Sequence, residues 1–289
     1  MKITRKPDWL RVSSIKNPNQ DAVAGILKSL NLNTICREAI CPNYNECFSR
    51  RVATFMILGT ACTRNCRFCN VRHDTPQPVE ADEPERIAQA VRALDMRYIV
   101  ITSVTRDDLP DGGAEHFANT VRAIRKASPS TAIEVLVPDF QGSSAALKIV
   151  AESKPDVISH NMETVEELYP EVRAGAQYRR SLELLRSIKE IDPQIRSKSG
   201  IMLGLGETQK QVERLFDDLR EVGCEFLTIG QYLAPSLQHL PVVEYIEPQR
   251  FEEYGKIARA KGFVFVASAP LVRSSYLAEE ALGQGTIQK

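Results

Sequence analysis

Short apolar runs alternate with longer stretches of helical period along most of the chain. The short runs are rich in β-branched residues and predict strands at residues 54–58, 98–102, 132–137, 156–159, 199–203, 226–230 and 263–267. Amphipathic helices lie between them, and the fullest apolar stripe covers residues 212–222. Thr208 or Glu207 can begin that helix and Gly223 can end it. Strands and helices that alternate in this way are typical of an α/β protein with a largely parallel sheet.

Polar residues gather directly after the predicted strands, at residues 59–62, 103–108, 160–163, 204–207 and 231–232. In parallel α/β barrels the carboxyl ends of the strands hold the active site, so these separate segments should converge on one pocket. The first six strands predict a partial TIM-type (β/α)6 barrel over residues 52–245. Residues 1–51 should then be an amino-terminal extension, and residues 246–289 a carboxyl-terminal closing segment.

Composition narrows the class of protein without choosing a function. The 289 residues include 37 Lys and Arg against 37 Asp and Glu, so no overall charge attracts nucleic acid or an anionic membrane. The basic start of the chain lacks the apolar run of a signal peptide, and no stretch approaches the roughly 20 apolar residues of a membrane helix. We therefore expect a cytoplasmic protein with neither a nucleic-acid nor a membrane partner, whose seven cysteines are metal ligands or buried thiols.

Six of the seven cysteines lie between Cys36 and Cys69. Cys62, Cys66 and Cys69, the barrel triplet, have the spacing C-x3-C-x2-C in the loop after the first predicted strand. Three thiolates leave one iron of a four-iron cluster without a protein ligand, and that iron can bind a small molecule. Cys224 lies apart among apolar residues and is expected to be a buried, inert thiol.

A second set of cysteines, Cys36, Cys41 and Cys47, has the spacing C-x4-C-x5-C just before the same strand, and we call it the auxiliary triplet. Zinc is one alternative, but its sites typically combine two Cys or Cys/His pairs, and neither triplet contains such pairs. Redox thiols are another alternative. Spacing and ligand count favour an iron–sulfur cluster at each triplet.

The motifs around the triplets resemble the signature of the lipoyl synthase family, in the radical S-adenosylmethionine (SAM) superfamily. The matching segments are CREAICPNYNEC at 36–47, ATFMILG at 53–59, CTRNCRFC at 62–69, RDDLPDGG at 106–113, HNMETV at 160–165, KSGIMLGLGE at 198–207 and RSSY at 273–276. The resemblance covers nearly the whole chain. Three departures occur, at Arg37 where the family usually has an acid, at Phe48 where it has Trp and at Asn70 where Ala is common. None of them replaces an expected ligand.

The resemblance implies two 4Fe-4S clusters and S-adenosylmethionine as cofactors. In the family, the cluster on the barrel triplet binds SAM, and one electron then releases a 5′-deoxyadenosyl radical that removes hydrogen from an alkyl chain. The auxiliary triplet holds a second cluster, the auxiliary cluster, which gives up its own sulfur. The implied activity is that of a sulfurtransferase that inserts two sulfur atoms at C6 and C8 of a protein-bound octanoyl-lysine.

By resemblance, a serine oxygen from residues 273–276 completes the auxiliary cluster. We expect Ser275 to be that metal ligand, with Ser274 as the alternative and Arg273 as a catalytic neighbour; without the family the motif would be interpreted as a carboxyl-terminal turn. Asn161 and Glu163 could reach the ribose hydroxyls of SAM, or could equally cap a helix. The full set of residues expected to bind SAM is Thr105, Asp107, Asn161, Glu163, Arg173, Lys198, Gln231 and Tyr232.

The implied substrate is an octanoylated lipoyl carrier domain or glycine cleavage H protein, and the implied electron donor is a protein such as ferredoxin or flavodoxin. Five arginines near the triplets could meet an acidic carrier surface: Arg50, Arg51, Arg64, Arg67 and Arg72. Such charges more often form a solvated rim, and we favour that role for each of them.

Two other functions are open at this stage. A different two-cluster radical enzyme, such as a biotin synthase-like one, would share the barrel triplet, but the auxiliary triplet and the motif at 273–276 argue against it. A ferredoxin-like electron carrier would also hold two clusters, but it would need four protein ligands for each cluster and no series of polar strand ends. The sequence therefore favours the sulfur-inserting enzyme.

Overall fold

The computed structural model describes residues 5–12, 18–276 and 278–284. Its strands are β1 (Asn33–Thr34), β2 (Thr54–Ile57), β3 (Ala61–Cys62), β4 (Arg72–His73), β5 (Tyr98–Ser103), β6 (Ala132–Leu136), β7 (Val157–Ser159), β8 (Arg196–Leu203), β9 (Phe226–Gln231) and β10 (Phe265–Ser268). Its α-helices are α1 (Pro18–Ser29), α2 (Ile35–Glu38), α3 (Tyr44–Ser49), α4 (Glu83–Ala93), α5 (Ala114–Ala127), α6 (Ser144–Glu152), α7 (Tyr169–Val172), α8 (Tyr178–Ile191), α9 (Gln209–Glu221), α10 (Pro248–Ala260) and α11 (Ala278–Gln284). Short 3-10 helices are η1 (Asp8–Leu10), η2 (Phe140–Gly142) and η3 (Glu166–Leu168). Among these helices none combines the length and the apolar character needed to cross a bilayer.

A sheet of eight strands carries the fold, in the order β1-β2-β5-β6-β7-β8-β9-β10. The β1–β2 pair is antiparallel, and every other pair in this sheet is parallel. The α/β fold with a partial barrel is confirmed, because the six main strands lie side by side in chain order and β10 continues the series. The sheet remains open, with β1 and β10 as its edges in the part of the chain that the structure describes.

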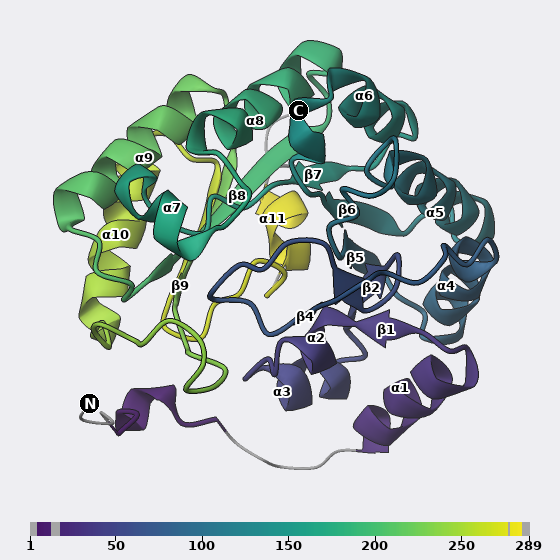
Figure 1. Cartoon of the computed structure of the whole chain (residues 1–289). Helices are drawn as coiled ribbons and strands as arrows, with labels where there is room; N and C mark the ends of the chain where they lie inside the picture. The colour runs from purple at the N-terminus through teal and green to yellow at the C-terminus, as the bar shows by residue number, and fades with distance from the viewer. Residues whose placement is uncertain (1–4, 13–17, 277, 285–289) are drawn as a thin grey trace.

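Helices form an outer ring around the curved sheet, in chain order from α4 through α5, α6 and α8 to α9 and α10 (Figure 1). The predicted helix at residues 212–222 is α9, whose apolar stripe is buried. Thr208 caps it through a capping box with Gln211. Gly223 follows its end with a φ of +78°, a conformation that glycine adopts without strain. The start at Thr208 and the end at Gly223 are therefore confirmed.

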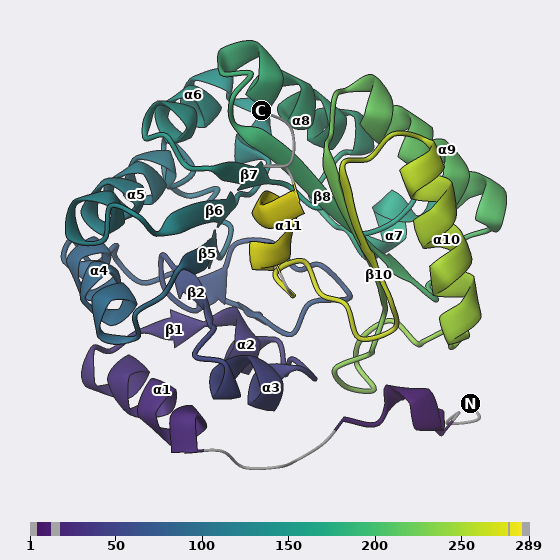
Figure 2. The same ribbon diagram turned by 180° about the vertical axis from the view of Figure 1, so that it is seen from behind.

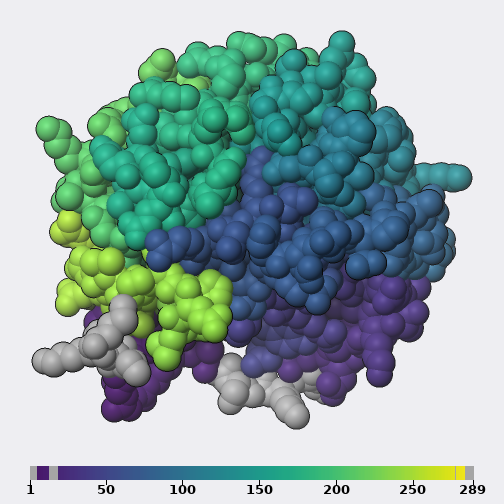
Figure 3. All heavy atoms as spheres, viewed as in Figure 1, coloured from purple at the N-terminus to yellow at the C-terminus, as the bar shows by residue number. Residues whose placement is uncertain are grey.

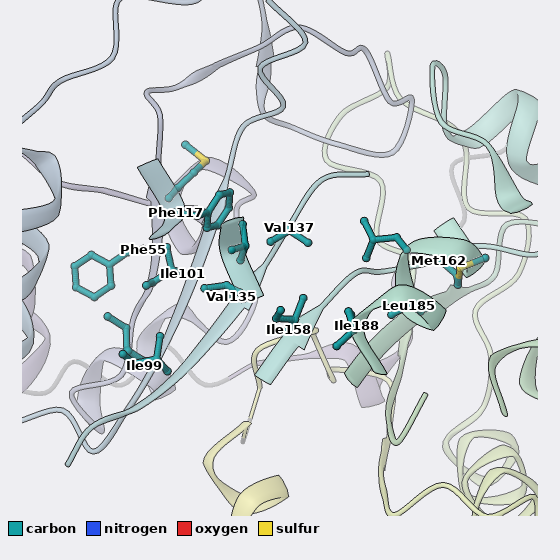
Figure 4. Packing of buried hydrophobic residues seen from close by; sticks show 14 of the residues in the cluster. Phe55, Ile99, Ile101, Phe117, Val135, Val137, Ile158, Met162, Leu185 and Ile188 are labelled. Atoms are coloured by element: carbon teal, nitrogen blue, oxygen red, sulfur yellow. The ribbon is translucent and has the colours of Figure 1, made fainter. Parts of the chain in front are cut away.

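The apolar core fills the space between the sheet and the outer helices. Ile99 and Ile101 of β5, Ile158 of β7 and Leu185 and Ile188 of α8 are fully buried in it (Figure 4). Each large apolar side chain contributes about 1.5–3 kcal/mol on burial. Because alternate residues of a strand face opposite sides, the remaining strand positions face the barrel interior, which is more polar.

Helix α11 closes the amino-terminal end of the barrel. Its Ala281 packs with Val157, Phe226 and Phe265, which are the first residues of β7, β9 and β10. Figure 2 shows α11 in the middle of the ring of strands and helices. The carboxyl ends of the strands, at which the polar segments gather, lie at the opposite end of the barrel.

Candidate active site

The barrel triplet lies on the loop that leaves β2 through a strained turn. Leu58 and Gly59 have φ values of +68° and +90°, and Leu58 is buried. The N–H of Leu58 donates to Glu83 Oε2 at 3.0 Å, and its carbonyl accepts from Arg106 at 3.3 Å. His116 Nε2 lies 2.7 Å from the same Glu83 oxygen. These supporting residues were missed by sequence reasoning, because no local spacing joins them to the cysteines.

Main-chain donors fix the first cysteine of this loop. Cys62 Sγ accepts from the N–H groups of Thr105 at 3.3 Å and Arg64 at 3.5 Å. The N–H and the hydroxyl of Thr63 both donate to the Thr105 carbonyl at 3.0 Å, and the Asp107 N–H donates to the Thr63 hydroxyl at 3.1 Å. Thr105 and Asp107, both expected to bind SAM, thus hold the cysteine loop against the end of β5.

Arg64 is a buried anchor of the same loop. Its guanidinium donates to both carboxylate oxygens of Asp107 at 2.7 and 2.9 Å and to Asp139 Oδ1 at 2.6 Å. Burial acts to raise the pKa of Asp139, but hydrogen bonding and charge from Arg64 hold it at about 2. The prediction that Arg64 is a rim charge is wrong, because its side chain is only 8% exposed. The other four arginines of that set are exposed, as a rim requires: Arg50, Arg51, Arg67 and Arg72.

The second half of the loop is held by α7 and by the segment after β9. The Arg67 N–H donates to the Val172 carbonyl, and the Leu240 N–H donates to the Arg67 carbonyl, both at 3.1 Å. His239 Nε2 lies 3.1 Å from the Cys69 carbonyl oxygen. Figure 3 shows the loop in blue across the centre of this face, between the green and the purple parts of the chain.

The auxiliary triplet lies on two short helices beside the sheet. Cys36 is on α2, Cys47 is on α3 and Cys41 lies between the helices. Helices of this length gain little stability from their own hydrogen bonds, so the triplet depends on contacts with its neighbours. One contact comes from the barrel-triplet loop, because the Asn70 side-chain amide donates to the Glu38 carbonyl at 2.6 Å.

Burial raises the pKa of five thiols in the two triplets. The pKa rises to about 11 for Cys36 and Cys66 and to about 12 for Cys47 and Cys69, and that of Cys41 also rises. Thiols of the same triplet raise one another's pKa further, because their charges interact. Such thiols become thiolates when they bind a cation. Among the described residues, no three His, Cys, Asp or Glu side chains converge on a position for a single metal ion.

Residues 271–276, the serine segment, bring the motif at 273–276 to the auxiliary triplet. The Asn43 side-chain amide donates to the Leu271 carbonyl at 2.7 Å. The Tyr276 hydroxyl donates to Glu46 Oε1 at 2.9 Å. These two bonds fasten both ends of the serine segment to the part of the chain that carries Cys41 and Cys47.

The two adjacent serines of the segment face different partners. The Ser274 hydroxyl donates to Asn161 Oδ1 at 3.0 Å, on the side of the barrel. Ser275 Oγ accepts from the Thr54 hydroxyl at 2.8 Å, and the residue after Thr54 pairs with Thr34, two residues before Cys36. Ser275 therefore lies on the side of the auxiliary triplet, whereas the hydroxyl of Ser274 is bonded to Asn161, one of the two residues expected at the ribose.

Two glycines inside the barrel make room for these contacts. A Cβ at Gly230 would lie 2.1 Å from the Val272 carbonyl oxygen. A Cβ at Gly200 would lie 2.6 Å from the Thr228 hydroxyl and 3.0 Å from Asn161 Oδ1. Since real Cβ atoms do not approach other atoms that closely, the serine segment can enter the barrel mouth because β9 has glycine at this position.

A series of charges connects the two triplets. Arg173 lies near Cys66 and lowers the pKa of that thiol against burial. Burial raises the pKa of Glu163, and the charges of Arg173 and Arg273 both oppose the rise. Burial lowers the pKa of Arg273, whereas Cys41 and Glu163 raise it. Arg173, Glu163 and Arg273 therefore lie close enough to interact electrostatically, between Cys66 of one triplet and Cys41 of the other.

Asn161 and Glu163 do not cap a helix, so that alternative is wrong. Helix η3 begins three residues later, at Glu166, with Val165 at its N-cap. The Asn161 side-chain amide instead donates to Glu163 Oε1 at 3.0 Å. The main chain of Glu163, with a φ of +65°, forms hydrogen bonds to β8 on both sides, which fixes the pair at the end of that strand.

Arg173 lies on a buried polar cluster below the loop. Its guanidinium donates to the Tyr169 hydroxyl at 2.7 Å and to Ser181 Oγ at 3.2 Å, and lies 3.5 Å from His160 Nε2. Burial and the charge of Arg173 lower the pKa of His160 to about 3. The imidazole is therefore neutral near pH 7, and its Nδ1–H can donate to the Val137 carbonyl at 2.8 Å.

Three other residues expected at SAM have partners within the protein for their polar atoms. Lys198 Nζ lies 2.9 Å from both carboxylate oxygens of Glu134, and both side chains are almost completely buried. The Gln231 amide bonds the main chain at four positions around the end of β9. The Tyr232 hydroxyl donates to the Leu240 carbonyl at 2.8 Å. Their assignment to SAM stays a prediction. Cys224 is fully buried, as predicted.

Comparison with known proteins identifies the family. Residues 56–219 match the model of the Radical SAM superfamily. The chain is 56% identical over 282 residues to a lipoyl synthase of Alkaliphilus metalliredigens, covering 98% of this chain and 97% of the relative. The chain belongs to the lipoyl synthase family. It is also 56% identical over 277 residues to the lipoyl synthase of Caldicellulosiruptor saccharolyticus, covering 96% and 97% of the two chains.

A solved structure supports the fold. Streptococcus suis SuiB bound to S-adenosylmethionine has a TM-score of 0.58 to this chain at 12% identity, and the match covers 78% of this chain and 53% of SuiB. The family identifies the chain as an enzyme, a sulfurtransferase of the radical SAM superfamily. Membership also implies SAM and a 4Fe-4S cluster as cofactors.

Proposed function

We propose that this enzyme inserts two sulfur atoms, at C6 and C8 of an octanoyl-lysine on a carrier protein, and that the auxiliary cluster is the sulfur source. The observation that carries the proposal is the hydrogen bond from Thr54 to Ser275, at the end of β2 that pairs with the segment leading to Cys36. It supports Ser275 as the oxygen ligand that would complete a cluster on the auxiliary triplet. A second, fully ligated cluster is what a sulfur donor requires in addition to the cluster that serves SAM.

The barrel triplet suits a cluster with one open iron. It offers three thiols on one anchored loop. Arg173 and Glu163, which carry opposite charges, lie near these thiols. When bound, SAM and this cluster supply a 5′-deoxyadenosyl radical, which can remove hydrogen from an alkyl carbon that no general base could deprotonate.

The residues around the barrel triplet have separate roles in this proposal. The hydrogen-bonded pair of Asn161 and Glu163 suits two neighbouring ribose hydroxyls, since an amide and a carboxylate offer both a donor and acceptors. The Arg173 guanidinium suits the carboxylate of SAM, as a charge-assisted partner near Cys66. The remaining residues that we assign to this site are Thr105, Asp107, Lys198, Gln231 and Tyr232.

In our proposal the auxiliary cluster is a reagent and is consumed. For each sulfur inserted, one SAM and one electron would supply the radical that breaks one C–H bond; the carbon radical would then bond a cluster sulfide, and the electron released would reduce a cluster iron. Cys36, Cys41, Cys47 and Ser275 hold the cluster, and Arg273 lies near Cys41. A serine oxygen is a poorer ligand than a thiolate for soft, sulfur-bridged iron, so Ser275 suits an iron that has to be released.

We further propose that an octanoylated lipoyl carrier domain or glycine cleavage H protein presents the substrate, and that a ferredoxin or flavodoxin supplies electrons. In this scheme residues 1–51 carry the auxiliary triplet, residues 52–245 are the radical SAM barrel and residues 246–289 bring the motif at 273–276. The contacts between the serine segment and the auxiliary triplet support that division of roles.

The direct test uses protein reconstituted anaerobically with iron and sulfide, then mixed with reductant, SAM and an octanoyl-lysyl peptide. The peptide is weighed by mass spectrometry and 5′-deoxyadenosine is quantified. We expect a peptide that has gained two sulfur atoms, and no such product from Ser275→Ala. Formation of 5′-deoxyadenosine without any sulfur-containing peptide would refute the sulfur insertion and leave the radical SAM class intact.

A further inference from the structure

Thr54 is the first residue of β2 and is almost completely buried. Its main chain is fixed in the sheet, in parallel register with Val100 of β5. Its hydroxyl donates to Ser275 Oγ at 2.8 Å, across 221 residues of sequence. Thr54 therefore presents a donor from the rigid barrel to a serine that arrives from the far end of the chain.

The same residue also lies beside the first cysteine of the auxiliary triplet. Its neighbour Phe55 pairs with Thr34 of β1, and Cys36 follows Thr34 by two residues at the start of α2. Thr54 thus lies next to the segment that carries Cys36 while its hydroxyl bonds Ser275, which comes from a different part of the chain. Among the described residues, Thr54 is the one hydrogen-bond partner of the Ser275 hydroxyl.

The neighbouring contacts limit where the Ser275 oxygen can lie. Ser274 is bonded to Asn161 at 3.0 Å, and Gly230 admits the Val272 carbonyl into the barrel mouth. These contacts fix the main chain of the serine segment, but the Ser275 side chain can still rotate about its Cα–Cβ bond. The Thr54 hydroxyl is the group that selects the rotamer in which Oγ faces the first residue of β2, next to the segment that leads to Cys36.

We propose that Thr54 is the positioning residue for the oxygen ligand of the auxiliary cluster. The inference rests on the proposed function, since it assumes that Ser275 ligates that cluster. The Thr54 hydroxyl holds Ser275 Oγ in the orientation for ligation, so that the fourth iron keeps its ligand until substrate arrives. Without this hydroxyl the three cysteines still bind the cluster, but the serine leaves its iron more easily.

The test compares wild type with Thr54→Val, which keeps the shape and removes the hydroxyl, and with Thr54→Ser, which keeps the hydroxyl. Full-length protein is reconstituted with iron-57 and sulfide. Mössbauer spectra report the ligation of the auxiliary cluster, and a colorimetric iron chelator reports the rate of iron release. We expect Thr54→Val to release auxiliary iron about fivefold faster, the factor that corresponds to a hydrogen bond of typical strength, and Thr54→Ser to resemble wild type.

Two further variants make the result specific. Thr102→Val removes another buried threonine hydroxyl, which donates to the Leu136 carbonyl at 3.2 Å, and should leave both readouts unchanged. Ser275→Ala removes the ligand itself, and its spectrum defines the unligated iron that Thr54→Val should approach.

The outcomes separate the two claims. A Thr54→Val protein with the spectrum and iron-release rate of wild type, beside an altered Ser275→Ala, overturns the role of Thr54 while serine ligation stands. If Ser275→Ala itself matches wild type, serine ligation fails, and the positioning role falls with it. Should Thr54→Val fail to bind the auxiliary cluster at all, Thr54→Ser must restore it; failure of that rescue also overturns the proposal.

Discussion

The two cysteine triplets are held in different ways. The loop of the barrel triplet is anchored by Arg64, which lies between Asp107 and Asp139, and by main-chain bonds to the end of β5. The auxiliary triplet lies on short helices, and its cover is the serine segment, which joins it through single hydrogen bonds. One of these bonds connects Asn43 with Leu271, 228 residues further along the chain.

This difference in support matches the different roles that we propose for the two clusters. A cofactor that serves every turnover gains from a buried, charge-paired support, because breaking such a pair costs about 3–5 kcal/mol. A cluster that is consumed needs a site that opens for removal and repair, and a few single hydrogen bonds, of about 1–3 kcal/mol each, suit that need. Variants that act on one support and spare the other test the comparison.

The largest effect should come from the cysteines themselves. We expect Cys66→Ala to abolish formation of 5′-deoxyadenosine, because the barrel triplet loses a ligand. Cys41→Ala should retain 5′-deoxyadenosine formation and lose the sulfur-containing product. Both are measured in the peptide assay by chromatography and mass spectrometry. If Cys41→Ala still yielded the doubly sulfurated peptide, the two triplets would not have separate roles.

The second-largest effect should come from replacing Arg64, the buried anchor of the barrel-triplet loop. Arg64→Met should lower the free energy of unfolding by about 3–5 kcal/mol, because it leaves the Asp139 carboxylate buried with weaker compensation. Chemical denaturation measures this, and iron analysis should show fewer irons at the barrel triplet. Arg67→Met is the control, since Arg67 is exposed, and should change stability by no more than about 0.5 kcal/mol. Equal stability of the two variants would contradict the anchoring role.

The buried histidine below the barrel triplet predicts a pH dependence. His160 has its pKa lowered from 6.5 to about 3, so between these values the unfolded chain binds more protons than the folded one. The contribution of the neutral imidazole to the free energy of unfolding is therefore fully present above pH 6.5. It falls on acidification, by about 2–3 kcal/mol between pH 6.5 and 4.5. Denaturation curves at several pH values measure the slope. His160→Asn should flatten it, and the exposed His73→Asn should not; identical slopes for all three proteins would refute the prediction.

A smaller effect, confined to the auxiliary cluster, should come from replacing Gly230. Gly230→Ala puts a Cβ 2.1 Å from the Val272 carbonyl, so the serine segment has to move, at a cost of about 1–3 kcal/mol. We expect loss of the auxiliary cluster with retention of 5′-deoxyadenosine formation. Gly25→Ala, in α1 with no atom within 4 Å of the new Cβ, is the matched control and should stabilise slightly. A fully loaded auxiliary cluster in Gly230→Ala would show that the close approach is unnecessary.

The sequence predicted what depends on local pattern. The parallel strands, the start of α9 at Thr208 and the buried Cys224 all follow from periodicity and capping over a few residues. The cysteine spacing predicted the triplets for the same reason, since each triplet lies within one short segment. The motif at 273–276 was recognised by resemblance, and its position next to the auxiliary triplet is what the fold adds.

Contacts between distant segments were not predictable from spacing. Arg64 is wedged between Asp107 and Asp139, which follow different strands, so its burial depends on how β5 and β6 lie in the sheet. The pairing of Glu83 with His116 depends in the same way on the packing of α4 against α5. Charge and hydropathy are the same for an exposed and a buried arginine, which is why Arg64 was assigned to the rim.

One measurement tests the central claim that the auxiliary triplet holds a consumable reagent while the barrel triplet holds a permanent cofactor. The protein is loaded with iron and sulfur-34 sulfide, freed of excess sulfide, and given SAM, reductant and octanoyl-lysyl peptide in a medium with natural sulfide for one turnover. Our account predicts sulfur-34 at both positions of the product and loss of iron from the auxiliary triplet only. A product that carries sulfur from the medium, with both clusters intact, would contradict it.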